Sequence, residues 1–547
     1  MTTLNFANKR FLIVDNIKQS RDTLKQFAYS LGDVKVESVS FAKDAISACE
    51  SVAYDVVLLG YDLGENQKNG QQVLEELKTK SLIQRQSIII IITAEVSEAM
   101  VLAALEHKPD EYIAKPYTLQ DLKKRLLRSY VKKQSMAKVY RALDEGDENN
   151  VVELVKETIA KGTQYESECM GILSRQYFNM KRYAEAQDIY LEYQNEASCT
   201  WAKIGLGKVA FENKQFDKAE QYFKEIIEEN NRYLSAYDWL AKTYQAQENH
   251  ASAQNTLERC LLISPRSVGR LKLYANVCLE NEQFEKATNA LKKTNELAYH
   301  SIHNHPENAL LFAKAVLEHI HEMPIDQARK LNNKVFSALS LMTKDFDDVE
   351  LKIRSQLLTA CLQFTTKEKQ PAKLSLVAAE KLLDNHQHDM STQGKLESSR
   401  ALVRLDREQR AANILQQLAQ DNASDEDLLK EIDSCLTKPI SDNIIKAQQA
   451  IEIGMSYYKQ NQFSEAVNEL SSALRIIPHH TGLKLNLLQV FLVAYEKSPV
   501  DDNYIQRASD IINDMDNLPT SSYSTSRYIV LKEKYQQLTD HEESEEE

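Results

Sequence analysis

The sequence predicts two structural classes in one chain: an open, doubly wound α/β sheet of five parallel strands over residues 1–133, followed by an all-α superhelix of stacked helix pairs. In the first part, apolar runs of strand length alternate with amphipathic segments of helical length. Farther along, alanines recur at separations of 33, 34 and 34 residues, which is typical of an array of structural repeats. These alanines are Ala186, Ala219, Ala253 and Ala287.

The strands and helices of the first part follow from the hydrophobic pattern. Uninterrupted apolar runs at residues 11–14, 56–59 and 88–92 fit strands buried on both faces of a parallel sheet, and weaker strands are expected at 34–39 and 112–114. Their alternation with helices indicates a flavodoxin-like topology. We expect the helices at residues 21–31, 42–51, 70–78, 98–106 and 119–133.

Polar residues and one glycine stand where the predicted strands end. Asp15 and Asn16 follow the first strand, Gly60 follows the third, Thr93 the fourth and Lys115 the fifth. Because the carboxyl ends of parallel strands meet at one edge of a sheet, we expect these residues to line a common crevice.

Four segments carry a resemblance to a known family: FLIVDN, YDVVLLGYDLG, IIIIITAE and YIAKPY. In this order, and over residues from about 9 to 130, they resemble the receiver domain of bacterial response regulators. The resemblance implies a site where an aspartate accepts a phosphoryl group with the help of a divalent metal. It also implies that Asp15 is a metal ligand, Thr93 the switch hydroxyl, Lys115 the phosphate-pairing lysine and Tyr112 the switch aromatic.

The chain departs from the family at two positions of this site. Asn16 replaces the second acidic residue, so Mg²⁺ binding through Asp15 and Asn16 is possible but weakened. Counted along the third strand, the phosphoacceptor position falls on Gly60, whereas counted back eight residues from Gly70 it falls on Asp62. We favour Gly60, because strand periodicity fixes the face that a residue uses while loop length varies. The lysine of the site is then free to pair with Asp15.

The helix pairs resemble tetratricopeptide repeats. No Gly or Pro interrupts the chain from Leu119 until Gly146, so a continuous helix should join the α/β domain rigidly to the first repeat. We expect about five helix pairs over residues 134–300, degenerate helical repeats over 301–440, a further repeat with capping helices over 441–535, and a disordered acidic tail over 536–547.

The repeats predict protein partners. The first helices of stacked pairs line a concave face, and Lys and Asn side chains there suit an acidic or C-terminal peptide. The receiver resemblance adds contact with a histidine kinase or a second copy of the chain. The residues expected to bind a partner are Lys203, Lys208, Tyr237, Lys242, Gln245, Arg270, Lys272 and Asn276.

Composition and motifs argue against several functions. A net charge of −13 disfavours nucleic acid, and no apolar stretch approaches the roughly 20 residues that span a bilayer. The seven cysteines are scattered without a CxxC pair, which is typical of a reducing compartment. Nucleophile-elbow and phosphate-loop motifs are absent.

We therefore expect a cytoplasmic, bacterial, non-enzymatic signalling adaptor that works without phosphorylation. Two alternatives stay open. One is a phosphorylation-switched response regulator that uses Asp62, and the other is a structural scaffold in which the receiver is a dimerisation module.

Overall fold

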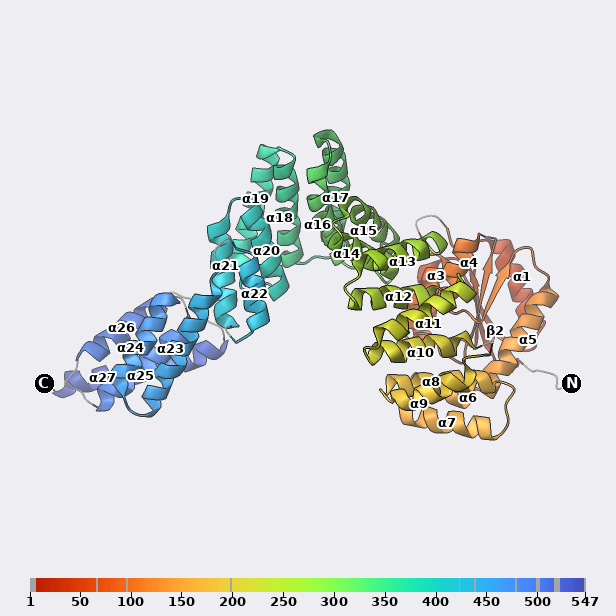
Figure 1. Cartoon of the computed structure of the whole chain (residues 1–547), viewed down its shortest axis with the longest axis horizontal. Coiled ribbons are helices and arrows are strands. Elements are labelled where there is room, and N and C mark those ends of the chain that lie inside the picture. Colours follow the sequence, from red (N-terminus) through yellow and green to blue (C-terminus); the bar gives the residue numbers. More distant parts are fainter. Residues whose placement is uncertain are drawn as a thin grey trace. The chain divides into compact units, whose positions relative to one another are not determined.

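The chain forms two compact units, Met1–Met323 and Pro324–Glu547. A computed structural model describes residues 6–64, 67–94, 97–196, 199–422, 424–436, 439–477, 480–497, 502–515 and 522–545. Figure 1 shows a strand-containing domain, coloured red to orange, at the start of the first unit, followed by helices in yellow and green. Among the described helices, none is both long and apolar enough to cross a membrane.

The predicted five-stranded, doubly wound sheet is confirmed. All strands are parallel, in the order β2-β1-β3-β4-β5. The strands are β1 Arg10–Val14, β2 Lys35–Val39, β3 Val56–Gly60, β4 Ile88–Thr93 and β5 Glu111–Ala114. The helices are α1 Lys18–Tyr29, α2 Ala42–Ser51, α3 Gly70–Thr79, α4 Glu98–Glu106 and α5 Leu119–Ser135. We call β1 to α5 the α/β domain.

Apart from Arg10 at the start of β1 and Thr93 at the end of β4, the three central strands have no polar side chain, because both faces of the sheet are covered. Successive residues point to opposite faces, so Leu12 and Leu59 enter one core and Ile13 and Leu58 enter the other. This packing fixes the register of the strands and therefore the place of each residue at their carboxyl ends.

The rest of the first unit is an array of five helix pairs and one further helix, which we call the first array. The pairs are α6 Ala137–Glu145 with α7 Glu148–Ala160, α8 Glu166–Asn179 with α9 Tyr183–Tyr193, α10 Thr200–Glu212 with α11 Phe216–Glu229, α12 Leu234–Ala246 with α13 His250–Ile263, and α14 Val268–Glu280 with α15 Phe284–Ala298. Helix α16 Glu307–His319 and the short 3₁₀ helix η1 Ile320–Glu322 follow.

The second unit is also helical. It contains α17 Ile325–Asp345, α18 Val349–Thr365, α19 Lys369–His386, α20 Thr392–Arg404, α21 Glu408–Asp421, α22 Glu426–Ser434, α23 Ser441–Lys459, α24 Phe463–Ile476, α25 Thr481–Lys497, α26 Asp502–Met515 and α27 Ser522–Glu545. The prediction of a disordered tail over 536–547 was wrong as far as Glu545, because α27 continues and its Tyr535 and Leu538 pack against the core of the unit. Residues 546 and 547 lie outside the described part.

The turns inside the helix pairs share one geometry. In four of the five pairs of the first array, the second residue after the first helix has a φ of 58° or 59°, and the next N–H donates to the carbonyl five residues earlier at 2.7–2.8 Å. This Schellman arrangement satisfies carbonyls at the helix end. The left-handed residues are Lys181, Lys214, Glu248 and Glu282, and the same conformation recurs at Lys367, Asp406 and Asn461. Two of these turns, at Lys367 and Asp406, fall in the segment 301–440, so repeat-type pairs continue there.

The expected continuous helix between the α/β domain and the first array is interrupted at one residue. Helix α5 ends at Ser135, Met136 has φ −101° and ψ 6°, and α6 begins at Ala137. Met136 is fully buried, with its sulfur 3.5 Å from the Cys169 sulfur on α8. The prediction of an unbroken helix was therefore wrong, but the junction is a single residue anchored in the core of the first array.

Replacing Gly207 with alanine should lower the free energy of unfolding by about 1–3 kcal/mol, the usual cost of overpacking a filled core. A Cβ at Gly207 on α10 would lie 2.5 Å from Cε1 of Phe223, whose ring is fully buried on α11. Urea denaturation followed by circular dichroism measures the change.

Gly269→Ala is the matched control. Gly269 lies exposed on α14, and no atom lies within 4 Å of an added Cβ. Alanine there should be neutral or stabilise the protein by up to about 1 kcal/mol, because glycine is a poor helix former. Equal effects at the two positions would contradict the helix packing described here.

Candidate functional site

Asp15 is at the centre of the crevice at the carboxyl end of the sheet. It directly follows β1, and only 2% of its surface is exposed. Its Oδ1 accepts a hydrogen bond from the Ile17 N–H at 2.9 Å, and its Oδ2 accepts one from the Ser20 hydroxyl at 2.7 Å. Arg21 donates from Nη1 to the Asp15 carbonyl oxygen at 2.7 Å. The start of α1 therefore holds the acidic residue in place.

Lys115, which follows β5, completes the environment of this carboxylate. Its Nζ lies 3.1 Å from Oδ2 of Asp15, and its backbone N–H donates to the Thr93 carbonyl at 2.6 Å. The expected pairing of the lysine with Asp15 is confirmed. A buried carboxylate is costly without such a partner, so Lys115 offsets part of the cost of burying Asp15.

Gly60 and Asp62 occupy very different places. Gly60 ends β3, and a Cβ on it would lie 3.4 Å from Oδ2 of Asp15 and 3.0 Å from the Val14 carbonyl oxygen. A side chain at position 60 would therefore enter the crevice. Asp62 is exposed, and its Oδ1 accepts a hydrogen bond from the Gly64 N–H at 2.9 Å within the following turn.

The remaining predicted crevice residues lie at the ends of β4 and β5. Thr93 is buried, and half-buried Tyr112 packs against the core on one face of the sheet. Burial raises the pKa of Tyr117, and the nearby Asp15 charge raises it further. These residues and Asp15 are therefore brought to one edge of the sheet, as the strand pattern predicts.

Tyr61 connects this crevice to α4, and the sequence reasoning missed it. Its ring is buried, and its hydroxyl lies 3.4 Å from the sulfur of Met100 on α4. The Met100 sulfur in turn lies 3.7 Å from Nη1 of Arg266 in the first array. The sequence did offer one indication of this role, because Tyr61 directly follows Gly60 at the end of β3.

The oxygen donors of the crevice do not fit a divalent cation. Mg²⁺ is usually held by one or two carboxylates with free oxygen lone pairs. The two oxygens of Asp15 already accept from Ile17, Ser20 and Lys115, and Gly60 contributes no side chain. Within the described ranges, no group of three or more His, Cys, Asp or Glu residues could hold a metal ion.

A second feature of the first unit is the contact between α4 and the first array. Leu102 on α4 packs against the apolar core of the array. Glu106, the last residue of α4, accepts a hydrogen bond at Oε1 from the Ser264 hydroxyl at 2.8 Å and lies 3.4 Å from Nη1 of Arg270. We call this set of contacts the α4 seat.

Arg270 is the buried charge of the α4 seat. It is 5% exposed, and it donates from Nε and Nη2 to the two carboxylate oxygens of Asp238 at 2.8 and 3.0 Å. Burial alone would lower the pKa of Arg270, but the hydrogen bonds and charge of Asp238, together with Glu106, raise it above its ordinary value. The sequence assigned Arg270 to an external partner; instead it binds the chain's own α/β domain.

Further polar contacts join the α/β domain to the first array. His303 lies 2.8 Å from Glu75 on α3, measured from Nε2 to Oε1. Burial would raise the pKa of Glu75, but the hydrogen bond from His303 and the charges of His107 and His303 lower it overall. Other ion pairs join Lys132 to Glu168 at 2.7 Å and Arg85 to Asp144 at 3.1 Å.

The other residues expected to bind a partner fall in several environments. Tyr237 was wrongly placed on the binding face: it is 1% exposed, because it packs between helices of the array, with the Arg259 guanidinium 5.5 Å from its ring centre. Lys203 forms an ion pair with Glu229. Lys242 and Asn276 are exposed, whereas Lys203, Lys208, Gln245 and Lys272 are half-buried.

Comparison with protein families gives two matches. The model of the response regulator receiver domain matches residues 11–127. The model of anaphase-promoting complex, cyclosome, subunit 3 matches residues 212–294, which lie in the first array.

Comparison with curated proteins gives relatives for each part. Chemotaxis protein CheY1 of Helicobacter pylori is 30% identical over 119 residues, which cover 21% of this chain and 93% of that protein. Transcriptional regulatory protein CiaR of Streptococcus pneumoniae is 31% identical over 117 residues, covering 21% and 49%. Protein O-mannosyl-transferase TMTC1 of Homo sapiens is 27% identical over 135 residues, covering 24% and 15%. The chain therefore spans half or less of the last two proteins.

A solved structure is also similar to the α/β domain. The CheY-like receiver domain protein of Methanospirillum hungatei JF-1 is 24% identical, with 23% of this chain and 98% of that chain covered and a TM-score of 0.21.

Removing the Glu106 side chain should loosen the α4 seat. Glu106→Ala leaves Ser264 and Nη1 of Arg270 without this acceptor, and a hydrogen bond to a charged group contributes about 1.5–3 kcal/mol. Amide hydrogen exchange in α4 and α14 should therefore quicken by about 10- to 100-fold.

Glu228→Ala serves as the control, because Glu228 is exposed on α11 away from the seat. It should leave exchange in α4 unchanged. If Glu106→Ala also leaves α4 unchanged, Glu106 does not hold the α/β domain to the array.

Proposed function

Because this chain belongs to the response regulator receiver family, we propose that it is a signalling adaptor whose receiver is not switched by phosphorylation. It combines a receiver with helix repeats that bind proteins, and we assign its output to that binding. We further propose that it catalyses no reaction.

The observation that carries this proposal is the environment of Gly60. A Cβ there would enter the crevice beside Asp15, which is where an acceptor carboxylate would have to stand. Phosphoryl transfer to the receiver needs a carboxylate nucleophile, and glycine has none. We therefore take Gly60 as the phosphoacceptor position that has lost its function.

The state of Lys115 supports the same proposal. Its ammonium group is paired with Asp15 at 3.1 Å. Asp62, the alternative acceptor, is exposed and bonded to the turn that follows it. A phosphoryl group on Asp62 would stand outside the environment formed by Asp15 and Lys115.

The exposed part of the first array offers a surface for the protein binding that we assign as the output of the adaptor. Lys242 and Asn276 keep exposed side chains on the first helices of their pairs, where a cation and an amide suit an acidic or C-terminal peptide. We propose such a segment of a partner protein as the binding target.

Wild-type protein incubated with acetyl phosphate and Mg²⁺ should show no gain of about 80 Da, the mass of one phosphoryl group, in intact-mass measurement. Gly60→Asp should gain this mass, because Thr93 and Lys115 remain at the crevice. The reaction should be slow, because Asn16 replaces an acidic metal ligand.

Asp62→Asn is the matched variant for the alternative acceptor. Like the wild type, it should show no mass gain after incubation with acetyl phosphate and Mg²⁺. A gain of about 80 Da in the wild type that is lost in Asp62→Asn would show a working phosphorylation switch and overturn the proposal.

A further inference from the structure

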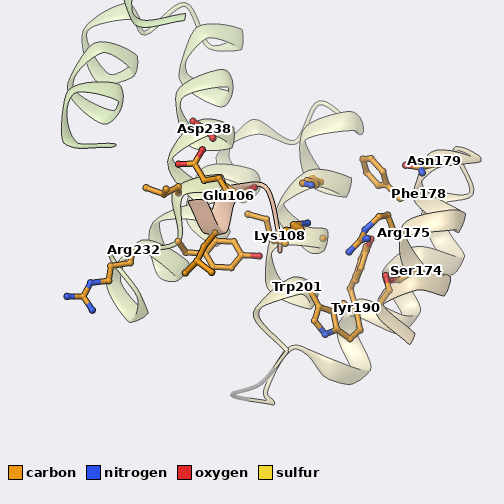
Figure 2. Close-up of a pocket in the computed structure, with 18 of the residues that line it drawn as sticks. Glu106, Lys108, Ser174, Arg175, Phe178, Asn179, Tyr190, Trp201, Arg232 and Asp238 are labelled. Carbon is orange, nitrogen blue, oxygen red and sulfur yellow. The ribbon is translucent and has the colours of Figure 1, made fainter. Parts of the chain in front are cut away.

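A cavity of about 670 Å³ lies between α4 of the receiver and the first helices of the repeats. Receiver residues Leu102, Leu105, Glu106 and Lys108 line it together with residues of α8, α9, α10, α12 and α14 and of the segment before α12. Figure 2 shows Glu106 and Lys108 between Asp238 and Arg175. Its volume falls within the range of about 300–1,000 Å³ that is usual for small-ligand sites.

The lining of the cavity is positively charged, whereas the whole protein has a negative net charge. Its lining holds five Lys and Arg residues but two carboxylates, whereas the whole chain has a net charge of −13. Both carboxylates, Glu106 and Asp238, are engaged by Arg270. The positive charge of Lys108, Arg175 and Lys208, which also line the cavity, is therefore not offset by its acidic residues.

Three of these cations repel one another. In the described part of the chain, the side chains of Lys108, Arg175 and Lys208 form no ion pair or hydrogen bond. Burial, together with the charges of Arg175, Lys108 and Lys242, lowers the pKa of Lys208 to about 8. Burial and then Arg175 likewise lower the pKa of Lys108. A bound anion would offset this repulsion.

Aromatic side chains form part of the same lining. Trp201 is fixed by Tyr190 and Tyr193, with ring centres 6.1 and 5.6 Å away, and by Gly171, where an added Cβ would lie 3.3 Å from the indole. Figure 2 shows Arg175, Tyr190 and Trp201 on the same side of the pocket. Flat apolar surface thus stands beside the guanidinium group, and Ser174 and Asn179 add hydrogen-bonding groups.

We propose that this cavity binds a small organic polyanion with a flat ring, of the nucleotide class. The planar fork of Arg175 suits a phosphate, with Lys108 and Lys208 as further charges, and the aromatic wall suits a base. The site lies outside the receiver crevice and does not depend on the assignment of Gly60.

Such a ligand would also hold the receiver to the repeats. Lys108 comes from the receiver, whereas Arg175 and Lys208 come from α8 and α10. Because the ligand contacts both sides, it binds the docked arrangement and stabilises it by mass action.

Isothermal titration of the full chain in EDTA, with ATP as the probe, tests this site. Pyrophosphate tests the charge alone, and a hexaglutamate peptide tests an acidic peptide in place of the nucleotide. ATP should bind at least about tenfold more tightly than either comparator, since only ATP joins phosphates to a ring. Arg175→Ala and Lys208→Gln should each weaken ATP binding by about tenfold or more.

Lys224→Gln is the control for Lys208→Gln. Both lysines lie over an aromatic ring of α12, Lys208 over Trp239 at 5.0 Å and Lys224 over Tyr244 at 5.8 Å from the ring centre, but only Lys208 lines the cavity. Lys224→Gln should change ATP affinity by less than about twofold, and Lys208→Arg should restore most of the loss.

The protonation of Lys208 provides a second readout. Its pKa of about 8 in the free protein should rise when an anion binds, so binding at pH 8 should take up protons. Titration heats in two buffers of different ionisation enthalpy measure this uptake, which should be lost in Lys208→Gln.

Three outcomes would overturn the proposal. These are no binding of ATP, binding of hexaglutamate as tight as that of ATP, and equal losses in Lys208→Gln and Lys224→Gln. The second would identify an acidic-peptide site, and the third would identify non-specific attraction to a basic surface.

Discussion

The contact of one buried guanidinium with two carboxylates ties the receiver to the repeats. Arg270 on α14 binds both oxygens of Asp238 on α12 and also faces Glu106 at the end of α4. A buried charge requires partners of opposite sign in fixed geometry, so this residue sets the approach of the receiver to the array. The cavity beside α4 exists only in this arrangement, because its walls come from both parts.

A chain of side-chain contacts connects the crevice to the α4 seat. Tyr61 follows Gly60 and reaches the sulfur of Met100, which also faces Arg266 of the repeats. At the crevice, Lys115 pairs with Asp15. Under the proposed function, the receiver therefore has one stable arrangement and acts as a fixed part of the binding scaffold. The single-residue junction at Met136 is consistent with this role.

The sequence predicted the features that depend on local pattern. Apolar runs located β1, β3 and β4, weaker patterns located β2 and β5, and strand periodicity placed Gly60 rather than Asp62 in the crevice with Asp15. The contacts between the receiver and the repeats could not be predicted, because Glu106 and Arg270 stand 164 residues apart and neither carries a local signal. For the same reason Arg270 was assigned to an outside partner and Tyr237 to a surface. The acidic tail was misjudged because Tyr535 and Leu538 give α27 a packed face.

Chemical cross-linking of the monomeric wild-type protein tests the docking of the receiver most directly. An amine-reactive reagent at pH 8 should modify Lys208 readily, because its pKa of about 8 leaves much of the amine uncharged. Lys108 of the receiver and Lys208 of the repeats line the same cavity, so mass spectrometry should find them joined. The Lys208–Lys242 link, whose two lysines lie over one Trp239 ring, is the internal standard. Recovery of the Lys208–Lys242 link without any Lys108–Lys208 link would contradict the docked arrangement.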